Sequence, residues 1–116
     1  MGDVSEERLE RALERRLHEV AGTAAVTERE LRELTEKGEA WARTLTGLAA
    51  ASERRLAALG RDPESSLSAL AAELERVERV RGERQRIVEL LAQVDERARV
   101  LRTAWLAGQM RSAGSA

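Results

Sequence analysis

The residues whose types and spacing come closest to a chemical site are Glu14 and His18, four positions apart in a segment that we expect to be helical. That spacing places both side chains on one helix face, where they could supply two ligands to a metal ion. Zinc sites take three or four protein ligands, yet His18 is the only histidine and the chain has no cysteine. Carboxylate-rich di-iron sites need paired Glu-x-x-His motifs, which the sequence lacks. We therefore expect no metal or cofactor, and interpret His18 as a histidine on the surface or at the edge of the apolar stripe.

The same inventory argues against catalysis. One histidine and no cysteine give no basis for a Ser/His/Asp or Cys/His nucleophile. A general-acid carboxylate needs a pocket that buries it, whereas the carboxylates here alternate with arginine on what we expect to be solvated helix faces. The glycines are scattered and follow no predicted strand, so no phosphate-binding loop is recognisable. We predict that the protein is not an enzyme.

Arginine and tryptophan are the remaining candidates for binding. Nineteen of the 20 basic residues are arginine, and they balance 21 acids to a net charge of −1. The balance is uneven along the chain, with seven arginines against four acids in residues 81–111 and five acids against two arginines in residues 62–80. We expect these segments to pair within the chain or across a dimer. The alternative is contact with nucleic-acid phosphates through a set of arginines in the last helix, namely Arg81, Arg84, Arg97, Arg99 and Arg102.

Trp41 and Trp105 are the only aromatic residues. Each lies on an apolar helical stripe, so core packing is one interpretation and an exposed anchor for a protein partner is the other. The candidate partner-binding residues are therefore Trp41, Trp105, Arg81, Arg84, Arg97 and Arg102.

The elements that must position these residues are helices. Charged residues make up 35% of the 116-residue chain, alanine and leucine are abundant, and β-branched and aromatic residues are scarce. The longest expected helix covers residues 63–107 and, at 1.5 Å per residue, would be about 70 Å long. A helix of that length, charged on its other faces, needs a partner along its apolar stripe. The stripe consists of Leu67, Leu70, Leu74, Val77, Ile87, Leu91, Val94, Ala98, Leu101 and Trp105.

The preceding residues supply that partner. We predict helices over about 4–21, with a stripe of Leu9, Leu13, Leu17 and Val20, and over 28–59, opened by a capping box at Thr27. Whether residues 21–27 break the helix or continue it is left open. Gly60 ends the second helix, and Asp62-Pro63 is expected to begin the third, so the last two helices are antiparallel neighbours. In this register Gly82 lies opposite Trp41, and Trp105 lies opposite Leu17 and Val20.

These elements predict an all-α fold of three helices, a long antiparallel, coiled-coil-like hairpin with an additional N-terminal helix. We expect a single domain over 1–107 and a flexible tail over 108–116. Spare apolar positions beside the stripe, namely Leu56, Leu90, Val100 and Leu106, favour a homodimer. The expected function is a non-catalytic protein-protein interaction module, a scaffold, adaptor or chaperone-like helper; the alternative is a small helical subunit of a nucleoprotein complex. The N-terminus lacks an apolar segment and no run could span a bilayer, so we expect a cytoplasmic protein without membrane contact, and the composition suggests a bacterial source.

Overall fold

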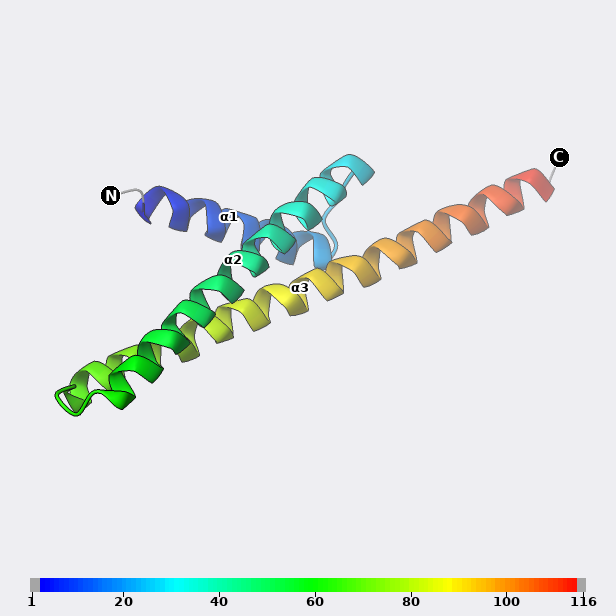
Figure 1. Cartoon of the computed structure of the whole chain (residues 1–116). Coiled ribbons are helices and arrows are strands. Elements are labelled where there is room, and N and C mark those ends of the chain that lie inside the picture. The colour runs from blue at the N-terminus through cyan, green and yellow to red at the C-terminus, as the bar shows by residue number, and fades with distance from the viewer. Residues whose placement is uncertain (1–2, 115–116) are drawn as a thin grey trace. The chain divides into compact units, whose positions relative to one another are not determined.

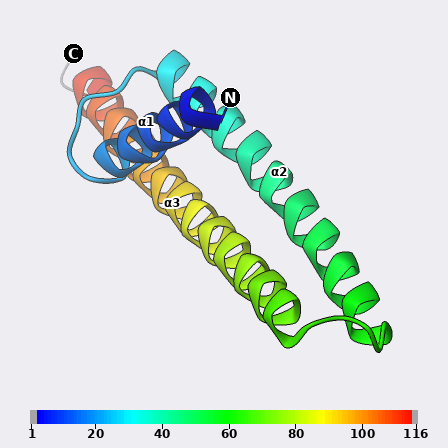
Figure 2. The same ribbon diagram turned by 90° about the vertical axis from the view of Figure 1, so that its left-hand side faces the viewer.

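The computed structural model describes residues 3–114, which form three helices and, within that range, no strand. Figures 1 and 2 show α1 (Asp3–Ala21), α2 (Glu28–Arg61) and α3 (Leu67–Gly114). The predicted all-α fold of three helices, with α2 and α3 packed together, is confirmed.

The chain falls into two compact units, and the single domain over 1–107 stays a prediction. Unit 1 consists of Met1–Thr35 with Leu90–Ala116, and unit 2 consists of Glu36–Glu89. Because α2 and α3 are each continuous through the boundary, both helices contribute to both units.

Unit 2 is an antiparallel pair made by the second part of α2 and the first part of α3. Arg55 donates to Glu73, Arg81 to Glu53, and Arg84 to Thr46 at 2.8 Å, so residue numbers fall in α2 as they rise in α3. The buried apolar residues of this pair are Leu45, Ala49, Val77 and Ile87. A Cβ atom at Gly82 would meet no heavy atom within 4 Å, so the expected packing of the Trp41 indole against Gly82 is wrong.

A polar cluster replaces part of the predicted apolar stripe of unit 2. Leu67 and Leu74 were expected in the seam, but they are 84% and 47% exposed. The neighbouring Glu73 is buried instead, and so is Ser52. Arg55 connects them, since its Nε donates to Glu73 Oε1 at 3.0 Å and its Nη2 donates to Ser52 Oγ at 2.9 Å. The gap that small Ser52 leaves between the helices is therefore filled by charged side chains.

Unit 1 packs α1 against the first turns of α2 and the second part of α3. Its buried apolar residues are Leu17, Val20, Leu31, Leu34, Leu90, Val94 and Ala98. Leu13 is half-buried, and the side chain of Leu9 lies outside those described. Leu90, expected beside the stripe, belongs to the core in place of half-buried Leu91.

The segment between α1 and α2, left open by the sequence, is a break. Gly22 N donates to the carbonyl oxygens of His18 and Glu19, which ends α1, and residues 24–27 are not helical. Thr27 then caps α2, because its Oγ1 accepts from Glu30 N at 3.0 Å. The Glu30 carboxylate accepts from Arg16 Nε at 2.6 Å, which lowers the pKa of Glu30 and ties α1 to the start of α2.

The bounds of α1 and α2 lie within two residues of the predicted ranges, but those of α3 differ at both ends. The expected start at Pro63 is corrected to Leu67. Asp62 Oδ1 accepts from Glu64 N and closes a turn, whereas Ser66 Oγ accepts from Ala69 N and is the true cap.

At its other end, α3 passes through Gly108 to Gly114, so the predicted end at residue 107 is corrected as well. One glycine costs about 1 kcal/mol in a helix, and no proline follows to stop it. Flexibility of residues 108–116 stays a prediction.

Candidate protein-binding groove

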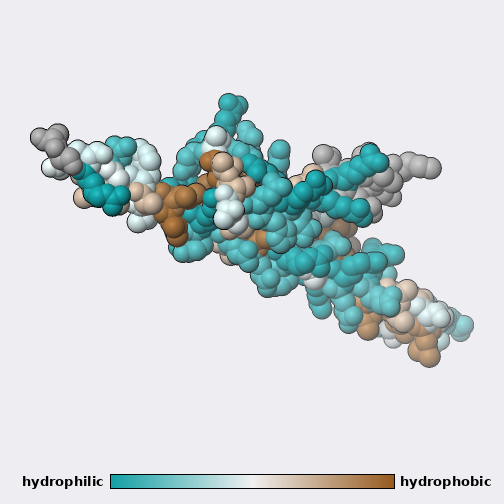
Figure 3. Space-filling model, turned by 180° about the vertical axis from the view of Figure 1, so that it is seen from behind, coloured by the Kyte–Doolittle hydropathy of each residue, from teal (hydrophilic) through white to brown (hydrophobic). Residues whose placement is uncertain are grey.

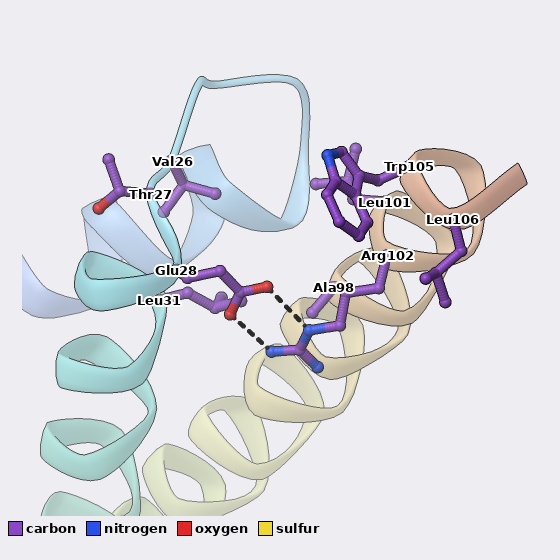
Figure 4. A pocket seen from close by; sticks show the side chains of 9 residues that line it. All are labelled: Val26, Thr27, Glu28, Leu31, Ala98, Leu101, Arg102, Trp105 and Leu106. Atoms are coloured by element: carbon purple, nitrogen blue, oxygen red, sulfur yellow. Dashed lines mark hydrogen bonds and ion pairs between the residues drawn. The ribbon is translucent and has the colours of Figure 1, made fainter. Parts of the chain in front are cut away.

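A groove in unit 1 is the concave feature of the described residues that brings predicted binding residues together. Its volume is about 570 Å³, and it lies between the start of α2 and the second part of α3. Figure 4 shows the Trp105 ring and Leu101 on the α3 side, across from Val26 and Leu31. The full lining is Val26, Thr27, Glu28, Leu31, Ala98, Leu101, Arg102, Trp105 and Leu106.

The α3 wall of the groove is unusually exposed for an apolar surface. Leu101 and Trp105, one turn apart, are 44% and 63% exposed, and Leu106 is more than half exposed. Val100 and Met110 are further exposed apolar residues of α3, and every residue from 99 to 106 is exposed. Trp105 lines the groove with residues from 26–31 and 98–106, and its expected packing against Leu17 and Val20 stays a prediction. Large apolar side chains exposed this way mark interaction sites more often than isolated surface leucines do.

An ion pair crosses one side of the groove. Arg102 Nε and Nη2 donate to the two Glu28 carboxylate oxygens at 2.9 and 3.0 Å, the bidentate geometry drawn in Figure 4. The hydrogen bond from Arg102 lowers the pKa of the Glu28 carboxyl, and the same bond raises the pKa of Arg102. Both side chains are more than half exposed, so this pair is accessible to competition from another charged group.

Arg97 has a structural contact in unit 1. Its Nη1 donates to the carbonyl oxygens of Val20 at 2.6 Å and Ala24 at 2.7 Å. These oxygens belong to the end of α1 and the following loop, where helix carbonyls lack partners within the helix. Arg97 thus closes the carboxyl end of α1, and its predicted role in binding a partner stays a prediction.

The other predicted binding residues lie elsewhere in the molecule. Arg81 and Arg84 contact Glu53 and Thr46 within unit 2. Trp41, also in unit 2, is half-buried. Of the six candidates, the structure brings only Trp105 and Arg102 together in the groove. Arg99, named with the nucleic-acid alternative, pairs with Asp95 at 2.8 Å one turn earlier on α3.

Val26, Glu28, Leu31 and Leu106 line the groove but were missed as site residues. The capping box at Thr27 contained the signal for two of them. Val26 directly precedes the cap and Leu31 follows it by four residues, which is the spacing of a hydrophobic staple. Leu106 is one of the spare apolar positions beside the stripe, which indicated a homodimer and not a groove.

Within residues 3–114, no three histidine, cysteine or acidic side chains are grouped as a metal site would require. His18 is exposed in the last turn of α1. None of the described helices combines the length and apolarity needed to cross a membrane.

Comparison of the chain with models of protein families, with curated proteins and with solved structures found no match.

Proposed function

We propose that the chain is a non-catalytic interaction module that binds a helix of a protein partner in the groove of unit 1. The observation that carries the proposal is the groove of about 570 Å³ with Trp105 exposed on its wall. Tryptophan is favoured in binding hot spots because it buries a large apolar area with few rotatable bonds. Scaffold, adaptor and chaperone-like roles all fit such a module.

A helix suits the groove better than an extended peptide. Its walls are a helix start and a long helix, and the side chains at positions 101 and 105 form a ridge with the i, i+4 spacing that helix packing uses. The described residues contain no strand edge to which an extended peptide could add. The face of the molecule seen in Figure 3 is mostly hydrophilic, with separate hydrophobic patches.

Contact with nucleic acid is the weaker candidate. The five arginines named for it already contact protein groups: Arg81, Arg84, Arg97, Arg99 and Arg102. Phosphate binding would have to displace those contacts. The homodimer, the cytoplasmic location and the bacterial source stay predictions.

The test uses Trp105 as its own reporter, in a Trp41→Phe background. The probe is a synthetic amphipathic peptide of about 18 residues, or five helical turns, with leucine along one stripe and glutamine elsewhere. We expect a blue shift of the Trp105 emission on binding, and at least about tenfold weaker binding by Leu101→Ser, since loss of a buried leucine contact costs well over 1.4 kcal/mol.

The matched control is Leu67→Ser, which removes a leucine that is 84% exposed in unit 2. It should leave the affinity unchanged. Absence of binding, or equal loss in both variants, would contradict the proposal.

A further inference from the structure

We infer that residues 22–27 form a hinge at which α1 and α2 can join into one continuous helix, and that Arg16 and Arg97 hold the hinge bent. All the residues involved belong to unit 1, which contains α1, the start of α2 and the second part of α3. The effect of the hinge on the groove rests on the proposed function, whereas the hinge itself does not.

The sequence of the hinge does not force a helix to end. Residues 22–27 contain no proline, since the single proline of the chain is Pro63. Gly22 is the natural stop signal, yet no glycine in the described part of the chain has a positive φ, the conformation with which glycine ends many helices. A single glycine is also tolerated inside a helix, as Gly108 is in α3. The chain could therefore continue through these residues as a helix.

Two arginine side chains occupy the hydrogen-bonding positions that a continuous helix would fill. In such a helix the carbonyl oxygens of Val20, Ala24 and Ala25 would accept from backbone N–H groups four residues later. In the structure, Arg97 Nη1 donates to Val20 at 2.6 Å and to Ala24 at 2.7 Å. The carbonyl oxygen of Ala25 accepts from Arg16 Nη2 at 3.1 Å. The guanidinium groups thus replace backbone donors and stabilise the bend.

The bent form has further contacts that a continuous helix cannot make. Arg16 Nε donates to Glu30 Oε1 at 2.6 Å, whereas these two residues would lie about 21 Å apart along a continuous helix. Leu17 and Val20 are at most 1% exposed, and α1 would have to leave that core to straighten. The bent form is therefore the main state. The continuous helix is a minor state, whose population rises when the arginine contacts are lost.

The groove depends on the bent form. Val26 and Leu31 both line it. In a continuous helix these residues are five positions apart, which turns their side chains about 140° away from each other around the helix axis. They could not then contact the same occupant. An occupant of the groove therefore stabilises the bent form, and a shift toward the continuous helix weakens binding.

The distance between α1 and α2 distinguishes the two forms. The chain has no cysteine, so spin labels can be attached at exposed positions of the two helices through Ala12→Cys and Arg32→Cys. Twenty residues of continuous helix would separate the labels by about 30 Å. The contact between Arg16 and Glu30 keeps them closer in the bent form. Pulsed electron spin resonance measures the ratio of the two distances.

Arg97→Met should raise the ratio of the long to the short distance at least about tenfold, because the hydrogen bonds from its charged donor stabilise only the bent form. Arg99→Met is the matched control, since Arg99 pairs with Asp95 and Glu96 on its own helix face, and it should leave the ratio unchanged.

Gly22→Ala tests the hinge with both arginines in place. A Cβ atom at position 22 would meet the carbonyl oxygens of His18 and Glu19 at 3.4 and 3.5 Å, which are ordinary contacts, so the bent form is not blocked. The higher helix propensity of alanine should raise the ratio by up to about fivefold, alone or added to Arg97→Met. This variant carries the test if Arg97→Met does not fold.

Ala25→Pro separates a continuous helix from an α1 that has only detached. Proline in a helix interior removes a hydrogen bond and clashes with the preceding turn, so Ala25→Pro should abolish the long distance in the variant with Arg97→Met and Gly22→Ala. Persistence of the long distance with proline present would overturn the inference. So would an unchanged ratio in the variant with Arg97→Met and Gly22→Ala.

The leucine-and-glutamine peptide tests the coupling to the groove. A saturating amount should lower the long-distance population severalfold. If the peptide bound without changing that population, the coupling would be wrong. If it did not bind at all, the proposed function would fail, while the distances in the peptide-free protein would still decide the hinge.

Discussion

Unit 2 and unit 1 contain different parts of the same two helices, α2 and α3. They differ in what fills the space between these helices within each unit. In unit 2 the space beside Ser52 is filled by the Glu73 carboxylate, held by Arg55. In unit 1 the space beside Leu31 stays an apolar groove, with Leu101 and Trp105 on its wall. Unit 2 buries a charged residue where apolar residues were expected. Unit 1 exposes Leu101, which was expected on the covered stripe, and Trp105, for which core packing and an exposed anchor were both open.

Both choices sacrifice stability. A buried carboxylate loses hydration, which its hydrogen bonds from Ser52 and Arg55 must offset. An exposed indole and leucine forgo the gain of burial.

We hypothesise that the polar cluster fixes the register of unit 2, because sliding the helices would leave Glu73 without Arg55. The exposed groove, in contrast, keeps unit 1 able to accept a partner. Replacing the polar cluster with leucine should then leave α2 and α3 helical but allow alternative pairings, detectable as doubled amide signals by NMR; a single set of signals would contradict the hypothesis.

Truncating a fully buried leucine should give the largest loss of stability, and the size of that loss distinguishes core residues from groove residues. Leu17 in unit 1 and Leu45 in unit 2 are at most 1% exposed. Replacing either with alanine should lower the free energy of unfolding by about 2–5 kcal/mol, from lost burial and a cavity. Trp105→Ala, although it removes a larger side chain, should change stability by only about 0.5 kcal/mol, as expected at an exposed position. Urea denaturation followed by circular dichroism measures all three.

The comparison between Leu17 and Trp105 tests most directly whether Trp105 is part of the core, because both residues belong to unit 1. If Trp105→Ala destabilised the protein as much as Leu17→Ala, Trp105 would be part of the core and the groove would not be available to a partner.

Replacing the Arg97 side chain should give the next largest loss of stability. Arg97→Met keeps an unbranched apolar side chain but leaves the carbonyl oxygens of Val20 and Ala24 without their donor. Hydrogen bonds with a charged partner are worth about 1.5–3 kcal/mol, so stability should fall by that amount. Hydrogen exchange should also show earlier opening of the last turn of α1. Arg99→Met serves as control, since Arg99 pairs with Asp95 and Glu96 on its own exposed helix face. A loss equal to that of Arg97→Met would show that Arg97 has no special role.

Sequence reasoning found the helices and the antiparallel pairing, because Thr27 and Gly60 are strong local signals and the apolar stripe has a clear period. It failed where two neighbouring positions competed for the same place. Choosing between Leu74 and Glu73 as the buried residue depends on the position of Arg55, eighteen residues earlier, and a stripe pattern does not encode that position. The groove was not predicted for a related reason: the exposure of Trp105 depends on where α2 begins in space, and the sequence left core packing and an exposed anchor both open for this residue.

Acid and salt should have the smallest effects on stability, and they should distinguish the buried ion pair of Glu73 from the exposed ion pair of Glu28. Burial alone would raise the pKa of Glu73, but the hydrogen bonds from Ser52 and Arg55 outweigh it and the pKa is lowered; the pKa of Glu28 is lowered by its hydrogen bond from Arg102. Since both carboxyls have a lower pKa in the folded state, each contributes stability that is complete above the usual value of 4.5 and is lost as the pH falls through the lowered pKa. Glu73→Gln and Glu28→Gln should each reduce the loss of stability on acidification, measured as the urea midpoint between about pH 3 and 7.

The Glu28 side chain is 63% exposed and the Glu73 side chain only 10%, so about 0.5 M NaCl should abolish the Glu28 contribution and leave most of the Glu73 contribution. Equal screening of the two would mean that the Glu73 cluster is as open to solvent as the edge of the groove, and the contrast between a closed unit 2 and an open unit 1 would fail.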